Sequence, residues 1–377
     1  MEEDGNIPED VEVIYLDEDD EFTEEVIDED MFDEEPEPDD EDFSKITFTK
    51  HSQSVFCGDL SKDNQLAVTG GEDDIAYVWS TETGDVKLTC TGHKDSVIAV
   101  CFNHDNKLLA TGDMSGMIQV WNTNDNKLVW CYESDDLEWL TWHTFANVLI
   151  AGTQSGEIYV WQIPQGNCHV LTSHGSSCTC GKLLPDGKQI LAGYADGLVK
   201  LWDIKTASGK WQVSDQSKAN VTSIEIDSNG TLCSVAPSSN LINISNGKSL
   251  GALLVEGETD IEAHIFNSEL NLLITGSLGG QICVWDVAKQ VIRHQARLDS
   301  GITVLKLGLN GTVFIGSTGG PVYLCDVRTG SHLHTLKGHK ANVLSLCLAN
   351  DGDSVLTTSD DKTAKIFIIN KIVNKSE

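Results

Sequence analysis

The chain has 377 residues, with 59 Asp and Glu against 25 Lys and Arg, a formal net charge of −34. So strong an acidic excess repels nucleic acid and anionic membranes, and it attracts basic protein segments. We therefore expect no direct nucleic-acid partner and no membrane insertion, and we expect protein partners that carry positive charge.

Residues 1–42 hold 24 of the acidic residues and no Lys or Arg. Self-repulsion opposes collapse, and the apolar clusters in this stretch are too small to offset the entropy of ordering. The sequence predicts a disordered acidic tail over 1–42, a globular body over 43–370 and a short C-terminal tail over 371–377. The acidic tail either attracts a basic partner or acts as a solvated segment that aids solubility.

The chain has no apolar run of 18 residues and no secretory signal at its N-terminus. Its 11 cysteines are an odd number, and many lie inside strand patterns, as reduced packing residues do. We expect a cytoplasmic protein, with the nucleus as a further compartment.

The body repeats with a period of 40–42 residues, and each unit carries four short strand signals separated by turns. A period near 40 with four strands is typical of a WD40 β-propeller. The third strand of successive units ends at Trp79, Trp121, Trp161, Trp202, Ile244, Trp285, Cys325 and Phe367. This predicts an all-β, eight-bladed propeller.

The fifth unit lacks its Trp, so seven blades with an insertion remain an alternative. Residues 240–245 have strand character and fill the missing position, which favours eight. The last unit ends after its third strand. Residues 45–49 have β character and no role in the first unit, so they are expected to close the last blade from the other end of the chain.

A histidine recurs 28 residues before the strand-ending aromatic in four units, often with Asp six residues and Thr ten residues before that aromatic. His, Asp and a hydroxyl group suggest a catalytic triad. However, an active site is normally built once, whereas a structural hydrogen-bond network recurs with the blade. The predicted network consists of His51, Thr69, Asp73, Trp79, His93, Thr111, Trp121, His174, Asp196, Trp202, His339, Thr357 and Asp361.

Two further patterns suggest chemistry and are rejected. The cluster Cys168, His169, His174, Cys178 and Cys180 lacks paired C-x-x-C motifs, and Cys178 and Cys180 fit strand alternation. The Gly181-Lys182 pair resembles the end of a phosphate loop but has the wrong spacing and no following Ser or Thr. We expect no metal, no cofactor and no enzymatic activity.

In a propeller, the loops before the first strand and between the second and third strands of each blade share one face, here called the top face. Many of these loops are acidic, whereas many Lys residues fall in the loops of the opposite, bottom face. An aromatic side chain beside carboxylates suits a Lys or Arg. Trp139 and Trp142 lie close to such acids, although both also fit a core role. The predicted partner-binding residues are Glu72, Asp74, Asp95, Asp113, Asp135, Asp136, Trp139 and Asp360.

The chain resembles the angio-associated migratory cell protein family in residues 51–57, 70–74, 92–97, 110–116 and 136–139. A generic WD repeat does not supply the Gly-Asp-Met-Ser-Gly run at 112–116 or the Asp-Leu-Glu-Trp run at 136–139. The resemblance implies a cytoplasmic, non-enzymatic protein whose vertebrate relatives are associated with cell migration. It also implies an activity, because the fungal relative is a chaperone that holds the basic N-terminal segment of a new large-subunit ribosomal protein on an acidic propeller face.

Two functions follow as hypotheses. The first is a monomeric chaperone or escort that binds a basic segment of a large-subunit ribosomal protein on the top face and supports ribosome assembly. The second is a signalling scaffold in cell migration that docks folded protein partners on the propeller rim. The first requires salt-sensitive binding that depends on the top-face acids, whereas the second does not.

Overall fold

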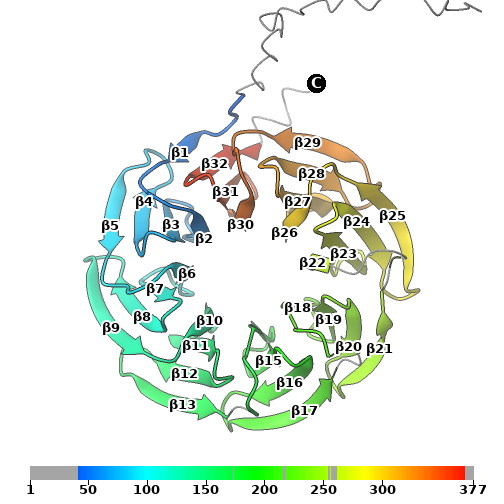
Figure 1. The fold of residues 1–377 in the computed structure, drawn as a ribbon, viewed down its shortest axis with the longest axis horizontal. Coiled ribbons are helices and arrows are strands. Elements are labelled where there is room, and N and C mark those ends of the chain that lie inside the picture. Colours follow the sequence, from blue (N-terminus) through cyan, green and yellow to red (C-terminus); the bar gives the residue numbers. More distant parts are fainter. Residues whose placement is uncertain (1–40, 173, 215–217, 254, 256–260, 370–377) are drawn as a thin grey trace, which may run out of the picture. The chain divides into compact units, whose positions relative to one another are not determined.

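The computed structural model describes residues 41–172, 174–214, 218–253, 255 and 261–369. These residues form eight four-stranded antiparallel sheets arranged around a ring (Figure 1). The prediction of eight blades is therefore confirmed, and the alternative of seven blades with an insertion is wrong. The predicted disorder of the acidic tail and the short tail at 371–377 lie outside the described residues.

The first four blades follow one another along the chain. Blade one comprises β2 (Val55–Leu60), β3 (Leu66–Gly71), β4 (Ala76–Ser80) and β5 (Val86–Cys90). Blade two comprises β6 (Val97–Phe102), β7 (Leu108–Asp113), β8 (Met117–Asn122) and β9 (Lys127–Glu133). Blade three comprises β10 (Leu137–Trp142), β11 (Val148–Thr153), β12 (Ile158–Gln162) and β13 (Asn167–Leu171). Blade four comprises β14 (Cys180–Leu183), β15 (Gln189–Gly193), β16 (Leu198–Asp203) and β17 (Ser208–Ser214).

The remaining blades continue the pattern, and a 3₁₀ turn, η2 (Leu309–Gly311), precedes β27. Blade five comprises β18 (Ser223–Ile226), β19 (Leu232–Ala236), β20 (Asn240–Asn243) and β21 (Lys248–Ala252). Blade six comprises β22 (Ile261–Asn267), β23 (Leu272–Ser277), β24 (Gln281–Asp286) and β25 (Val291–Arg297). Blade seven comprises β26 (Ile302–Leu307), β27 (Thr312–Ser317), β28 (Val322–Asp326) and β29 (His332–Leu336). Blade eight comprises β30 (Val343–Leu348), β31 (Ser354–Ser359), β32 (Ala364–Ile368) and β1 (Ile46–Phe48).

Strand β1 closes the ring, as the sequence predicted for residues 45–49. It pairs antiparallel with β32, with Ile46 opposite Ile366 and Phe48 opposite Ala364 (Figure 1). Ion pairs join Asp42 to Lys365 and Glu41 to Lys337. Residues 41 and 42, assigned to the tail from sequence, therefore contact the propeller body, and the boundary moves to residue 41.

The core lies between the blades, because each sheet is covered on both faces by its neighbours. Each cluster of buried side chains combines residues from two consecutive blades, such as Ile150 and Ile158 of blade three with Ile190 and Trp202 of blade four. The strands are therefore rich in consecutive apolar residues and do not alternate cleanly, as expected for sheets that are buried on both faces. No described helix is long and apolar enough to cross a membrane.

Replacing Phe48 by alanine tests the closure. Phe48 is 2% exposed and its ring stacks on that of Trp79 with 4.7 Å between centroids. The substitution leaves a cavity at the seam between blades eight and one, so we expect a loss of about 3–5 kcal/mol in the free energy of unfolding, measured in urea. Phe145→Ala is the matched control, since Phe145 is 65% exposed and its removal is expected to change stability by less than about 0.5 kcal/mol. Equal effects of the two substitutions would contradict this account of the closure.

Candidate functional site

The predicted network of blade one is present. His51 Nδ1 lies 2.9 Å from Asp73 Oδ1, and His51 Nε2 lies 3.0 Å from Thr69 Oγ1. Trp79 Nε1 donates to the same Thr69 oxygen at 3.2 Å. One proton order satisfies every group: the indole donates to Thr69, the Thr69 hydroxyl donates to His51, and His51 donates to the carboxylate. The network therefore ties the loop before β2 to the loop between β3 and β4.

The histidine–aspartate pair recurs in three other blades, with different partners around it. His339 lies 2.8 Å from Asp361 and 2.6 Å from Thr357 in blade eight. In blade four, His174 lies 3.0 Å from Asp196, and Trp202 donates to the Tyr194 hydroxyl at 3.2 Å. Sequence reasoning missed Tyr194, which accepts the bond from the indole as Thr69 does in blade one and meets the His174 ring edge-on, with 4.6 Å between centroids. A site built four times in one ring is a structural device, and it does not fit a catalytic triad.

Blade two corrects one prediction. Asp113, expected to bind a partner, is 0% exposed, and it lies 3.0 Å from His93 Nδ1. His93 Nε2 lies 2.8 Å from Thr111. Asp113 stands eight residues before Trp121, so a search at six residues missed its role in the network. The indole nitrogen of Trp121 is buried with no partner within the described part of the chain, so here the network stops at Thr111.

The carboxylates of the network are held in their charged form. Burial alone would raise the pKa of Asp73, but hydrogen bonds from His51 and from the Ser52 amide bring it below its ordinary value. The pKa values of Asp113, Asp196 and Asp361 are lowered in the same way, each against a contribution from burial and with a histidine as the main favourable partner. The top-face loops are thus fixed by charge-assisted hydrogen bonds.

Exposed acids gather on the top face over blades one to three. Glu72 and Asp74 lie between β3 and β4, Asp95 precedes β6, and Asp135 and Asp136 precede β10, all solvent-exposed. Asp360 is half-buried and accepts a hydrogen bond from Asn342 at 2.9 Å, so it is less available than the other five. Because Asp113 is buried and Asp360 is half-buried, five of the seven predicted acids remain as exposed carboxylates, and they form a cluster on three consecutive blades.

Met114 adds an apolar side chain to this cluster. It is 48% exposed and belongs to the loop between β7 and β8. The loop lies against the segment before β10: Leu137 donates its amide to Met114 O, and Ser134 donates its amide to Gly116 O. A side chain at Gly116, where φ is +85°, would overlap the backbone of Asp135. Sequence reasoning missed Met114, although it belongs to the Gly-Asp-Met-Ser-Gly run.

Trp139 and Trp142 are packing residues. Trp139 is partly buried, its Nε1 donates to Cys178 O at 3.0 Å, and a Cβ at Gly152 or Gly181 would overlap its ring. Trp142 is buried and donates Nε1 to Cys101 O at 3.0 Å. The indole of Trp139 therefore fills the space between blades three and four, which corrects its assignment to the partner-binding face.

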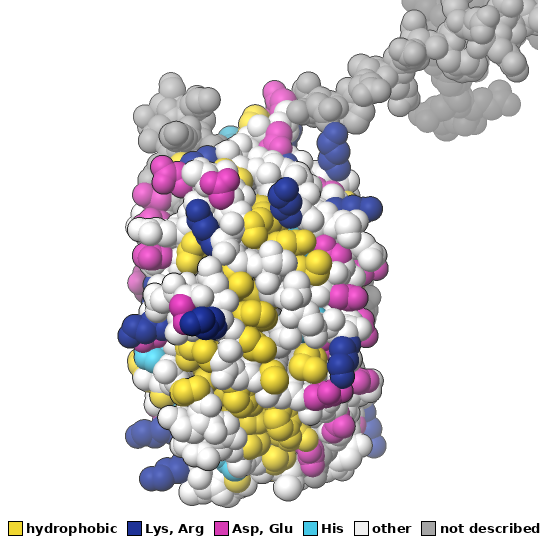
Figure 2. Space-filling view, turned by 90° about the vertical axis from the view of Figure 1, so that its left-hand side faces the viewer, with side chains coloured by type: hydrophobic (Ala, Val, Ile, Leu, Met, Phe, Trp, Pro, Cys, Tyr) yellow, Lys and Arg dark blue, Asp and Glu magenta, His cyan; other side chains and the backbone are white. Residues whose placement is uncertain are grey.

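The bottom face is less basic than the sequence suggested. Many of its cations form ion pairs with an aspartate of the same or the neighbouring turn. These pairs are Lys107–Asp105, Lys127–Asp125, Lys210–Asp203, Lys289–Asp286 and Arg328–Asp326. Figure 2 shows acidic and basic side chains along both flanks of the propeller and hydrophobic side chains in a band on the rim between them.

The cysteine and histidine cluster of blades three and four is dispersed. His169 Nε2 donates to Ile204 O at 2.7 Å, His174 belongs to the network, and burial raises the pKa of the Cys178 and Cys180 thiols, the latter to about 12. Within the described ranges, no three His, Cys, Asp or Glu side chains come together as a metal site.

Comparisons with known proteins agree with this geometry. The WD40-like domain model matches residues 53–359. The human angio-associated migratory cell protein is 37% identical over 352 residues, covering 88% of this chain and 81% of the human protein. The chain belongs to the angio-associated migratory cell protein family. Its WD40 propeller shares the fold of that family's fungal relatives as well.

Two fungal proteins extend the angio-associated migratory cell protein family comparison. The ribosome assembly protein SQT1 of Saccharomyces cerevisiae is 25% identical, with 85% of each chain covered. The crystal structure of Chaetomium thermophilum Sqt1 bound to the N-terminus of the ribosomal protein L10 superposes with a TM-score of 0.79 and 20% identity, covering 87% of this chain and all of that one. At this identity the superposition establishes the shared fold.

The depressed pKa values of the network carboxylates predict a pH dependence. A carboxyl group whose folded-state pKa lies below its unfolded value stabilises the fold above the unfolded pKa, and this stabilisation is lost as pH falls through the folded pKa. We expect the free energy of unfolding to fall steadily below about pH 4, the ordinary range of aspartate. Asp361→Asn should cost about 2 kcal/mol at pH 7 and flatten this acid limb, measured by urea titrations between pH 3 and pH 7.

Asp74→Asn is the control for this measurement, since Asp74 is an exposed top-face carboxylate outside the network. It should leave both the stability at pH 7 and the acid limb unchanged. An Asp361→Asn protein with an unaltered acid limb would contradict the role assigned to the network.

Proposed function

We propose that this chain is a non-enzymatic chaperone or escort that binds the basic N-terminal segment of a large-subunit ribosomal protein and supports ribosome assembly. It acts as a monomer in the cytoplasm, with the nucleus as a second compartment. The observation that carries the proposal is the cluster of five exposed carboxylates, Glu72, Asp74, Asp95, Asp135 and Asp136, on a top face fixed by the buried networks.

An extended basic segment suits this surface physically. Its Lys and Arg side chains pair with the carboxylates, and their aliphatic stems pack on Met114. Carboxylates on three consecutive blades favour a ligand that runs along the ring over one that occupies a single pocket. Capture is expected to be fast and weakened by salt. A bound basic segment is also shielded from RNA, because the acidic surface repels phosphate.

Two relatives support the proposal of a ribosomal-protein client. The yeast relative is named a ribosome assembly protein, and the Chaetomium structure holds the N-terminus of the ribosomal protein L10. This chain shares their fold and presents an acidic loop cluster, which is the charge that a basic ribosomal segment requires.

Charge reversal of the cluster tests the proposal. The variant Glu72→Lys, Asp74→Lys, Asp95→Lys and Asp136→Lys replaces attraction by repulsion at four positions. We expect its affinity for a fluorescein-labelled peptide of the basic N-terminal segment of the cognate L10-type protein to fall more than about tenfold at physiological salt, or about 1.4 kcal/mol. The affinity is measured by fluorescence anisotropy across a salt series.

The matched control reverses four exposed acids of bottom-face loops, Glu82, Asp85, Asp125 and Asp186, and so changes the net charge equally. This control should retain more than half of the wild-type affinity. Equal losses in the two variants would reduce the effect to net charge, and unaltered binding by the top-face variant would refute the proposal.

A signalling scaffold for folded partners is the second candidate, and the rim carries the observation that favours it. Strand β9 exposes Leu128 (45%), Val129 (38%) and Tyr132 (37%). Tyr132 stacks on Trp130 with 6.0 Å between ring centroids. Strand β9 lies on the left-hand side of Figure 1, and Figure 2 shows hydrophobic side chains in a band on that side of the molecule. Exposed apolar side chains in such a group favour contact with a folded surface.

Leu128→Glu and Tyr132→Glu separate the two functions. If folded partners bind the rim, this double variant no longer binds the partners whose binding resists salt, and it still binds the basic peptide. Co-precipitation from cells at two salt concentrations measures this. If every partner is retained by the double variant and lost by the top-face variant, the scaffold function is excluded.

A further inference from the structure

The residue at the end of the third strand fills the space toward the preceding blade. Trp79 is buried between blades eight and one, Trp161 between blades two and three, and Phe367 between blades seven and eight. At two junctions this residue is small: Ile244 between blades four and five, and Cys325 between blades six and seven.

At the junction between blades four and five, an aromatic ring from the outer strand fills the space that the small Ile244 leaves. Trp211 of β17 lies opposite Leu201 and donates Nε1 to Ile244 O at 2.7 Å. The equivalent residue of β25 is His294, which lies opposite Val284 and donates Nε2 to Arg328 O at 2.9 Å. An imidazole is smaller than an indole. The junction between blades six and seven therefore has a small residue at both positions.

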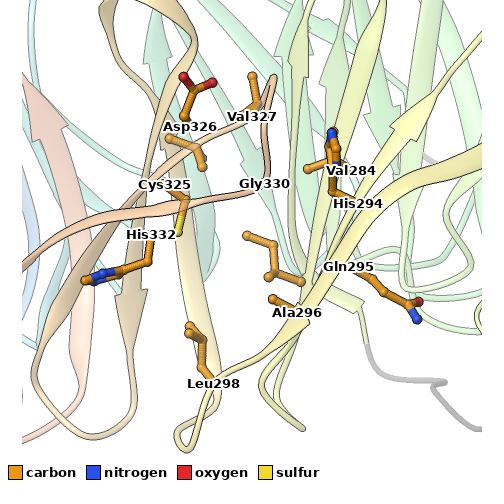
Figure 3. Close-up of a pocket in the computed structure, with 12 residues that line it drawn as sticks. Val284, His294, Gln295, Ala296, Leu298, Cys325, Asp326, Val327, Gly330 and His332 are labelled. Atoms are coloured by element: carbon orange, nitrogen blue, oxygen red, sulfur yellow. The ribbon is translucent and has the colours of Figure 1, made fainter.

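A cavity of about 80 Å³ remains at this junction, open toward the rim. Its walls are mostly apolar and include Ile282, Val284, Ala296, Cys325 and Val327. The side chains of His294, Gln295, Asp326 and His332 also line it. Figure 3 shows that β25 supplies one wall and that β28 with the following turn supplies the other. Burial raises the pKa of the Cys325 thiol to about 11, so this thiol is neutral at neutral pH. The carboxylate of Asp326, which also lines the cavity, is paired with Arg328 at 2.8 Å.

The stretch of sequence that supplies most of the cavity lining differs in charge from the rest of the chain. Residues 286–337 contain six Lys and Arg against three Asp, a net charge of +3 in a chain of −34. All three arginines of the sequence, Arg293, Arg297 and Arg328, occur in this stretch, together with His294, His332 and His334. Arg293 and Arg297 are exposed on β25, the strand that forms one wall.

We propose that this cavity is a docking site for an acidic segment of a partner protein, which inserts one bulky apolar side chain, such as Phe, between blades six and seven. The inserted side chain occupies the space that a tryptophan fills at other junctions, and a flanking carboxylate pairs with the exposed Arg293 of β25. The acidic top face repels such a segment, so charge complementarity directs it to this part of the rim. The site is separate from the top face, so one propeller can hold a basic client and an acidic partner together.

The probe is a fluorescein-labelled heptapeptide, Glu-Asp-Glu-Phe-Glu-Asp-Glu, titrated with the full chain and followed by fluorescence anisotropy. The same peptide with Ala in place of Phe reports the apolar contribution. We expect the Phe peptide to bind at least about tenfold more tightly than the Ala peptide, because the Phe ring leaves water for an apolar cavity and the Ala methyl group does not fill it.

Two variants place the site. Cys325→Trp fills the cavity with an indole, as in other blades. It should lower the affinity for the Phe peptide at least tenfold and leave the affinity for the basic peptide unchanged. The double variant Arg293→Glu with Arg297→Glu should lower the affinity for the Phe peptide by a similar factor without filling the cavity. This variant tests the proposal even if the Cys325→Trp protein fails to fold. Lys210→Glu with Lys248→Glu, on the outer strands of blades four and five, is the matched charge control and should bind as wild type does.

Several results would overturn the proposal. These are no binding of the Phe peptide, equal binding of the Phe and Ala peptides, and full binding by a folded Cys325→Trp protein. A chain lacking residues 1–40 that binds the probe at least tenfold better than the full chain would also overturn it, since the occupant would then be the protein's own acidic segment.

Discussion

The pairing of β1 with β32 holds the ring together. Each blade is covered by its two neighbours, so the core is continuous around the circle and depends on the last blade having a complete edge. Three residue pairs of β1 provide that edge, and the stacking of Phe48 on Trp79 joins it to blade one. Without this strand, blade eight would present an unpaired edge, and the buried seam beside Trp79 would open to water.

The closed ring gives the loops of the top face a fixed frame. Hydrogen-bond networks connect the loop that enters a blade with the loop inside it, as His51, Asp73 and Thr69 do in blade one. The exposed acids Glu72 and Asp74 flank Asp73, so a buried charged anchor sets the position of two surface charges. A rigid acidic surface costs little ordering entropy on binding, which favours capture of a flexible basic segment. The rim, by contrast, consists of outer strands and offers apolar side chains.

Much of this was predictable from sequence because the repeat is covalently regular. The 40–42 residue period predicted the blades, and the absence of a fourth strand in the last unit predicted the closure. The spacing from histidine to the aromatic located the network in blades one, four and eight. The exceptions came from shifts within a unit: Asp113 stands two residues earlier than expected, and Tyr194, two residues after the expected threonine position, accepts the bond from Trp202. Trp139 was ambiguous because both faces of a propeller blade are buried, so strand alternation does not distinguish a core side chain from an exposed one. The positive charge of the bottom face was overestimated because the lysines were counted without the aspartates of the same turns, which pair with them.

The position of β1 has a consequence for biosynthesis. The strand emerges from the ribosome first, and its partner β32 is made about 320 residues later. At about 5–20 residues per second, the first strand waits roughly 15–60 s before its partner exists. During that interval the incomplete ring exposes the edges and apolar faces that the finished molecule covers. A protein proposed to escort other new chains would itself pass through a stage at which it needs protection, and translation speed over its last blade would set how long that stage lasts.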